Sequence, residues 1–189
     1  VLLQIHGGAW LIGHKAQQAR PLMHYMAERG FICVSINYRL SPRARWPDHL
    51  IDVKHALAWV KEHIAEYGGD PEFVVVTGGS AGGQLTALVA LTANDARYQP
   101  GFEHIDTRVQ GAIPFYAPYD FLDRERMQRT MGLRLLLRWF VIGKSARHAA
   151  ALYEEASPLS HVHTEAPPFL VIHGSHDSLT PIELSLIHI

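Results

Sequence analysis

The sequence has little of several features that mark other classes of protein. It has one cysteine in 189 residues, which excludes an internal disulfide framework and a cysteine-rich zinc site. Its 17 Lys and Arg residues nearly balance 18 Asp and Glu residues, so no net field draws it to nucleic acid or to an anionic membrane. Its uncharged apolar runs fall well short of the roughly 20 residues that span a bilayer. We expect no nucleic-acid partner and no membrane span.

The composition is that of a packed globular protein, with 48% hydrophobic and 19% charged residues. The chain opens with Val1, not Met, directly in an apolar run. We therefore expect a single partial domain over residues 1–189, cut at both ends. We expect this segment to be soluble and favour the cytoplasm, with an upstream signal or anchor as the alternative. The sequence says nothing about oligomeric state.

Five short apolar runs predict strands. Each is bounded by Gly, Pro, Asn or Asp, and near-continuous hydrophobicity is typical of strands buried on both faces. The runs are residues 2–5, 31–36, 73–77, 112–116 and 169–173.

Helical patterns separate these runs. Apolar residues recur at 3.6-residue spacing between Pro47 and Gly68, and residues 17–29 and 81–93 also resemble helices. Strands that alternate with helices favour an α/β fold, a mostly parallel sheet with helices on both faces.

The alternation breaks over residues 119–167, where Arg-rich helical segments replace a short helix and strand. We interpret this stretch as a helical cap inserted over one end of the sheet. Within it, residues 133–142 are strongly apolar, and Arg134 and Arg138 share one helical face. We expect a packed lid helix with two solvated arginines. The alternative is a helix that lines an apolar pocket or contacts lipid.

A Gly-Gly-Ser-Ala-Gly-Gly motif at residues 78–83 follows the third apolar run and precedes an apolar helix. This is G-x-S-x-G in its proper strand-to-helix context. A serine on such a tight turn takes strained backbone angles, which only small neighbours permit. The motif predicts Ser80 as a nucleophile. A phosphate-binding loop is disfavoured because Gln84 stands where that loop needs lysine. A plain glycine turn is the other alternative.

Residues 6–10, His-Gly-Gly-Ala-Trp, follow the first apolar run. Gly7, Gly8 and Ala9 carry little or no side chain, so successive backbone N–H groups are unobstructed. Acyl transfer needs fixed donors aimed at the charge that develops on the carbonyl oxygen. We predict an oxyanion hole in this loop, with a plain tight turn as the alternative.

Asp177 follows the last apolar run. A carboxylate at the end of a late strand can orient a histidine base, and an acid after the nucleophile in chain order matches α/β-hydrolases. A helix-capping role is the alternative. It is weakened by the capping box at residues 180–183, which supplies its own helix start. We predict Asp177 as the acid of a catalytic triad.

Thirteen histidines raise the alternative of a metal site. The candidate ligands are His161, His163, His173, His176 and Asp177. Their spacing on irregular segments is more typical of a solvated surface, and we expect no metal.

Together these motifs resemble the hormone-sensitive-lipase-like carboxylesterases of the α/β-hydrolase superfamily, in the branch called fold-3 or feruloyl-esterase-like. Residues 6–10 are similar to the family's H-G-G-G/A-W loop, residues 37–42 to its N-Y-R-L-[SA]-P segment, and residues 78–83 to its G-[DG]-S-A-G-G turn. The resemblance covers nearly the whole chain. It implies the α/β-hydrolase fold, with about five of eight strands present here.

The resemblance also implies site residues. The oxyanion donors would be the N–H groups of Gly8, Ala9 and Ala81, with Ser80 as nucleophile and no metal or organic cofactor. The family's base histidine lies beyond a further helix and strand, whereas this chain ends 12 residues after Asp177. His188 is a poor candidate because it is only 11 residues from Asp177. We expect the base to be missing from these residues and the chain by itself to be inactive.

The leading interpretation is a serine hydrolase that cleaves carboxylic esters of short or medium acyl chains through an acyl-enzyme. Its only implied partner is a small-molecule ester. Lysophospholipase or amidase activity on the same scaffold is one alternative. A non-catalytic ligand-binding relative that lacks the base is another.

Overall fold

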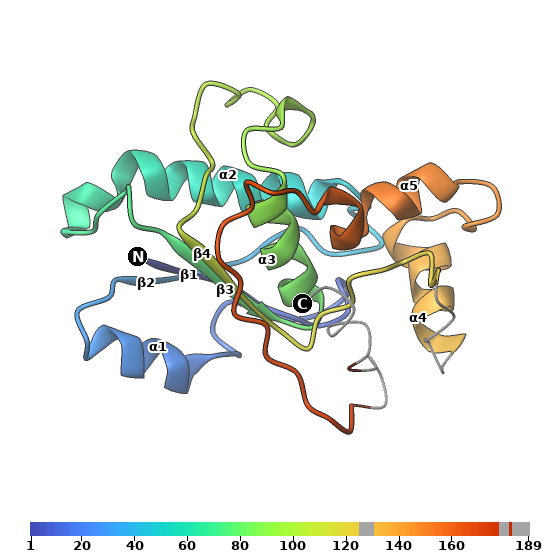
Figure 1. Ribbon diagram of the computed structural model, residues 1–189, viewed down its shortest axis with the longest axis horizontal. Coiled ribbons are helices and arrows are strands. Elements are labelled where there is room, and N and C mark those ends of the chain that lie inside the picture. Colours follow the sequence, from blue (N-terminus) through green and yellow to red (C-terminus); the bar gives the residue numbers. More distant parts are fainter. Residues whose placement is uncertain (125–130, 178–181, 183–189) are drawn as a thin grey trace.

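The computed structural model describes residues 1–124, 131–177 and 182. At its centre is a parallel sheet of four strands in the order β2-β1-β3-β4 (Figure 1). The strands are β1 (Leu2–Ile5), β2 (Cys33–Ile36), β3 (Val75–Gly79) and β4 (Gly111–Phe115). Each overlaps a predicted apolar run, so the parallel α/β architecture is confirmed.

The fifth run, residues 169–173, does not form a full strand. It lies parallel to β4 and makes isolated bridges at Phe169 and Ile172. The Ile172 N–H donates to the Pro114 carbonyl at 3.1 Å, so residue 114 of β4 faces this segment. Pro114 has no N–H to donate in return, and the ladder is interrupted there. The expected five strands are corrected to four strands and a bridged fifth segment.

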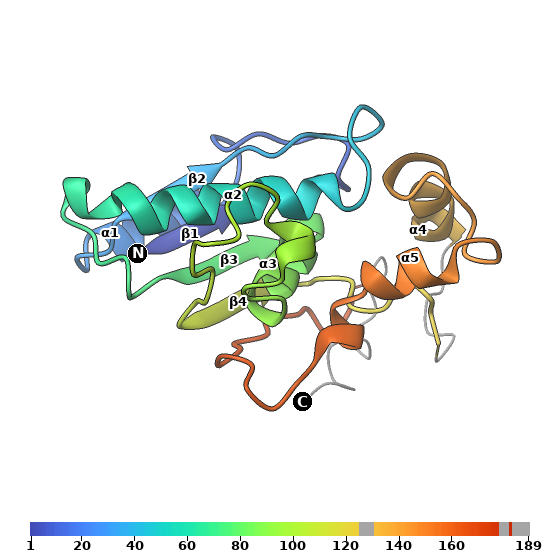
Figure 2. The same ribbon diagram turned by 90° about the horizontal axis from the view of Figure 1, so that it is seen from above.

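Helices cover both faces of the sheet. They are α1 (Arg20–Ala27), α2 (Asp48–His63) and α3 (Ala81–Leu91). The chain moves in one direction across the sheet from β1 to β2, and in the other direction from β2 to β3 and from β3 to β4. With right-handed crossovers, this reversal puts α1 on one face and α2 and α3 on the other. Figures 1 and 2 show this arrangement.

Residues 119–167 hold the helices of the predicted cap, which stand to the right of the sheet in both views (Figures 1 and 2). These are α4 (Met131–Leu136), the π-helical turn η3 (Leu137–Val141), α5 (Ala150–Glu155) and the short η4 (Pro158–His161). Leu137 and Val141 are buried, whereas Arg134 and Arg138 are exposed. Leu135, Trp139 and Phe140 of the same segment are exposed as well. The packed lid helix, the alternative of a helix that lines an apolar pocket or contacts lipid, and the capping role therefore all stay predictions.

The core lies between the sheet and helices α2 and α3. All eleven residues of α3 are buried, and none of them is charged. Two short 3₁₀ helices, η1 (Ile64–Tyr67) and η2 (Ala96–Tyr98), follow α2 and α3. The central position of α3 fixes the residue that precedes it, Ser80, relative to the whole sheet.

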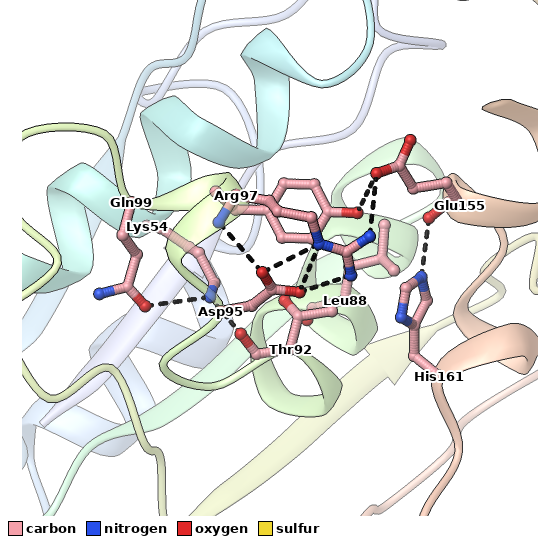
Figure 3. Close-up of polar contacts among 9 residues, drawn as sticks. Lys54, Leu88, Thr92, Asp95, Arg97, Gln99, Glu155 and His161 are labelled. Carbon is pink, nitrogen blue, oxygen red and sulfur yellow. Dashed lines mark hydrogen bonds and ion pairs between the residues drawn. The ribbon is translucent and has the colours of Figure 1, made fainter.

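Lys54, on α2, is a fully buried cation beside the end of α3. Its Nζ donates to the carbonyl of Thr92, the residue that caps α3, and to Gln99 Oε1 at 3.3 Å (Figure 3). The last carbonyls of a helix carry partial negative charge and lack partners within the helix. Lys54 therefore ties α3 to α2 at the end opposite Ser80. Burial lowers the pKa of Lys54 to about 8.

We expect Lys54 to make stability depend on pH. Between about pH 8 and lysine's ordinary value of 10.5, the unfolded chain binds more protons than the folded chain. This group therefore raises the free energy of unfolding as the pH rises through that window. In Lys54→Met, denaturant titrations should show a smaller rise across the window than wild type. Lys15→Met, at an exposed lysine, is the control. Equal slopes for wild type and Lys54→Met would contradict the prediction.

Candidate active site

Ser80 occupies the single residue between β3 and α3. Its φ of 55° and ψ of −120° lie in a region that non-glycine residues rarely adopt. Its N–H donates to the carbonyl of Phe115 at 2.9 Å, and its carbonyl accepts from the N–H of Gln84 at 3.0 Å. These bonds hold the strained turn between β4 and the first turn of α3. The half-buried Ser80 side chain is thus placed at the carboxyl end of the sheet.

Gly82 lets α3 pack directly on the end of β1. A Cβ at this position would overlap the carbonyl oxygens of both Ile5 and His6. Both obstacles are backbone atoms, so they cannot rotate away as a side chain could. Because Ile5 pairs with Gly78 in the sheet, the turn that carries Ser80 lies beside the loop that follows β1.

The loop after β1 has an unusual backbone. Gly8, Ala9 and Trp10 have φ values of 120°, 55° and 60°. The N–H groups of Leu11 and Ile12 donate back to the carbonyl of Gly8, both at 3.0 Å, and close the turn.

Three backbone N–H groups of this region have no hydrogen-bond partner in the part of the chain that the structure describes. The N–H groups of Gly8, Ala9 and Ala81 donate to none of the described residues. Ala81 is the first residue of α3, where the helix dipole favours negative charge. These are the three donors that the family resemblance implies, and their role stays a prediction.

Gly7 differs from its neighbours in the loop. Its N–H donates to Gln18 Oε1 at 2.7 Å. A Cβ on Gly7 would also lie 2.5 Å from the carbonyl oxygen of Gly79, so the loop packs against the end of β3 here. Since the Gly7 donor is engaged, we remove Gly7 from the expected set of oxyanion donors. Gly7 instead anchors the loop to Gln18 and to the end of β3.

The buried side chain of His6 contacts the backbone of this loop. Its Nδ1–H donates to the carbonyl of Gly7 at 2.8 Å, and its ring stacks on Tyr38 with ring centroids 4.4 Å apart. The Tyr38 hydroxyl in turn donates to the His6 carbonyl at 3.0 Å. Burial lowers the pKa of His6 below its usual value, which favours the neutral ring. A second residue of the 37–42 segment also contacts the loop, since the Ser41 N–H donates to the carbonyl of Trp10 at 2.8 Å.

Asp177 lies beside a histidine of its own segment. Its Oδ2 is 3.5 Å from Nε2 of His173, whose side chain is only 3% exposed. The structure therefore pairs Asp177 with His173, and the role of triad acid stays a prediction. His188 and most of the capping box at residues 180–183 lie outside the described residues.

The described residues include no candidate metal site and no candidate membrane helix. Within residues 1–124, 131–177 and 182, no group of three or more His, Cys, Asp or Glu side chains is arranged to hold a metal ion. His161 instead contacts the carbonyl of Glu155 at 2.8 Å (Figure 3). None of the helices that the structure describes is long and apolar enough to cross a membrane.

A parallel sheet covered on both faces, with a strained serine between strand and helix and backbone donors beside it, defines an α/β-hydrolase. The chain belongs to the BD-FAE family, whose sequence profile matches residues 1–187.

Similar proteins agree with this assignment. The chain is 59% identical over 184 residues to the probable carboxylic ester hydrolase LipM of Mycobacterium tuberculosis, which covers 97% of the chain and 42% of LipM. A truncated carbohydrate esterase from gut microbiota matches with a TM-score of 0.85 and 25% identity, over 98% of this chain and 70% of that one. Esterase 2 of Thermogutta terrifontis, phosphonylated by sarin, matches with a TM-score of 0.83 and 28% identity, over 98% and 65%. The chain thus spans less than half the length of LipM.

Proposed function

We propose that this protein hydrolyses carboxylic esters with Ser80 as the nucleophile. The observation that carries the proposal is the position of Ser80, held at φ 55° between β3 and α3. It lies beside a loop whose Gly8 and Ala9 N–H groups have no partner among the described residues. A serine in that place can approach a carbonyl carbon while the carbonyl oxygen enters the loop. The curated relative named as a carboxylic ester hydrolase supports the same reaction.

In the proposed acylation step, Ser80 Oγ attacks the ester carbonyl carbon and its proton passes to a general base. Negative charge develops on the carbonyl oxygen, where the N–H groups of Gly8, Ala9 and Ala81 stabilise it. The tetrahedral intermediate then expels the alcohol, which takes the proton from the base. The acyl group remains on Ser80.

In the deacylation step, water attacks the acyl carbon and gives its proton to the base. The same three donors stabilise the second oxyanion. Collapse releases the carboxylic acid and returns the proton to Ser80 Oγ. The base is proposed to be a histidine outside the described residues, oriented by Asp177. We propose short and medium acyl chains as substrates, and a small-molecule ester as the partner.

The proposal is tested with a fluorophosphonate probe on the full-length protein. The probe should form one covalent adduct, and mass spectrometry of its peptides should place the adduct on Ser80. p-Nitrophenyl esters of increasing acyl length should then be cleaved fastest among the short and medium chains. An adduct on another residue would refute Ser80 as nucleophile. A protein that binds esters but forms no adduct would instead be a non-catalytic relative.

A further inference from the structure

The loop that carries Gly8 and Ala9 needs an anchor. Gly8, Ala9 and Trp10 all have positive φ, which strains the two residues that are not glycine, and such a backbone persists only where its surroundings hold it. Trp10, the third of them, is buried, with 2% of its surface exposed. Its indole Nε1–H donates to Gln84 Oε1 at 3.1 Å, a bond between residues 74 positions apart. The loop is therefore held from α3, the helix that follows the nucleophile.

Gln84 connects three parts of the site. Its backbone N–H donates to the carbonyl of Ser80, one helical turn earlier. The side-chain amide accepts from Trp10 and donates through Nε2 to the carbonyl of Ala156 at 2.8 Å. An indole N–H can only donate and a carbonyl can only accept, so these partners fix which end of the amide is oxygen. Only 1% of the surface of Gln84 is exposed, so bulk solvent does not reach the amide to replace either partner.

A second contact from the same region reaches Trp10. The ring of Phe121 meets the indole edge-on, with ring centroids 5.5 Å apart. The N–H of Phe121 donates to Ser157 Oγ at 2.9 Å, next to Ala156. Phe121 therefore contacts the indole directly, and Ala156, at the end of α5, is connected to it through Gln84.

We propose that Gln84 is a positioning residue, whose side-chain amide holds Trp10 and thereby fixes the Gly8 and Ala9 N–H groups relative to Ser80. This inference rests on the proposed ester hydrolysis. Backbone donors stabilise a transition state only when they are already in place as charge develops. A loosened loop should therefore slow the chemical step while ground-state binding of the ester changes little.

Two substitutions in the full-length protein test whether the hydrogen bond between Gln84 and Trp10 positions the loop. Trp10→Phe removes the indole N–H but keeps an aromatic ring against Phe121, and Gln84→Leu removes both side-chain bonds. Each should lower kcat for p-nitrophenyl butyrate about 10-fold, with KM within about 2-fold of wild type. The double variant should be no slower than the slower single variant, because both changes break one connection.

Thr86→Val is the matched control. Thr86 is fully buried on the same helix, and its hydroxyl donates to the carbonyl of Gly82 at 2.8 Å. This change should lower the melting temperature and leave kcat unchanged. If Trp10→Phe behaves like the control, or raises KM as much as it lowers kcat, the positioning role is wrong. If Gln84→Leu fails to fold, the Trp10→Phe result still decides. Activity that survives in Ser80→Ala would overturn the proposed function instead.

Discussion

Replacing Ser80 with alanine is expected to lower kcat for ester hydrolysis by about 10⁵-fold or more. The substitution removes only Oγ, so the bonds that the Ser80 backbone makes to Phe115 and Gln84 are unaffected. The fold and the backbone donors should therefore persist while the nucleophile is lost. The residual rate would come from the oxyanion hole and from substrate binding. The measurement is steady-state hydrolysis of p-nitrophenyl butyrate, with circular dichroism to show that the variant is folded.

Ser35→Ala is the control for this experiment. Ser35 lies on β2, away from the turn after β3, and its hydroxyl donates to the Lys15 carbonyl at 2.7 Å. Its loss should leave kcat and fluorophosphonate labelling as in wild type. Ser80→Ala activity within about 100-fold of wild type would require another nucleophile and would end the proposed mechanism.

The predictability of the fold follows from how local its signals are. The strands of a parallel sheet covered on both faces are continuous apolar runs, so all four appear in the sequence. The run at residues 169–173 has the same composition and was predicted as a strand. Its failure to pair fully depends on Pro114, 55 residues earlier, on the edge that faces it. The apolar pattern of a run does not indicate whether the neighbouring strand has the N–H groups needed to pair with it.

At the site, too, features that depend on neighbouring residues could be predicted, whereas features that depend on distant residues could not. Ser80 could be predicted because the strained turn and the glycines that permit it lie within six residues of sequence. Gly7 was predicted to be a donor because its neighbours are small. Its N–H is taken by the side chain of Gln18, from the segment that leads into α1. Nothing in the loop's own sequence indicates that partner.

The role of Gln84 at the site could not be predicted from the sequence. In the sequence it served only to exclude a phosphate-binding loop, because lysine was absent. Its bonds to Trp10 and Ala156 join residues 74 and 72 positions away. A glutamine near the start of a mostly apolar helix was the available signal, since a buried amide must find partners. That signal identifies a buried hydrogen-bonding residue without saying which loop it holds.

Gly82→Ala is expected to damage both stability and activity. The added Cβ would overlap the carbonyl oxygens of Ile5 and His6, and neither can move unless β1 and α3 separate. Such overpacking costs about 1–3 kcal/mol of unfolding free energy. The separation would also displace Ser80 from the Gly8 and Ala9 donors. Since a misplacement of about 1 Å can cost about 100-fold in rate, kcat/KM should fall by about that factor.

Gly132→Ala separates this steric effect from the general effect of replacing glycine. Gly132 lies in α4, and a Cβ there would meet nothing within 4 Å. Alanine is favoured over glycine in a helix by about 1 kcal/mol, so this variant should be as stable as wild type or more stable. Urea denaturation and kcat/KM are measured for both variants. If Gly82→Ala retained wild-type kcat/KM, α3 could shift on β1 without moving Ser80 from its donors. The close packing of helix on strand would then not be what aligns the site.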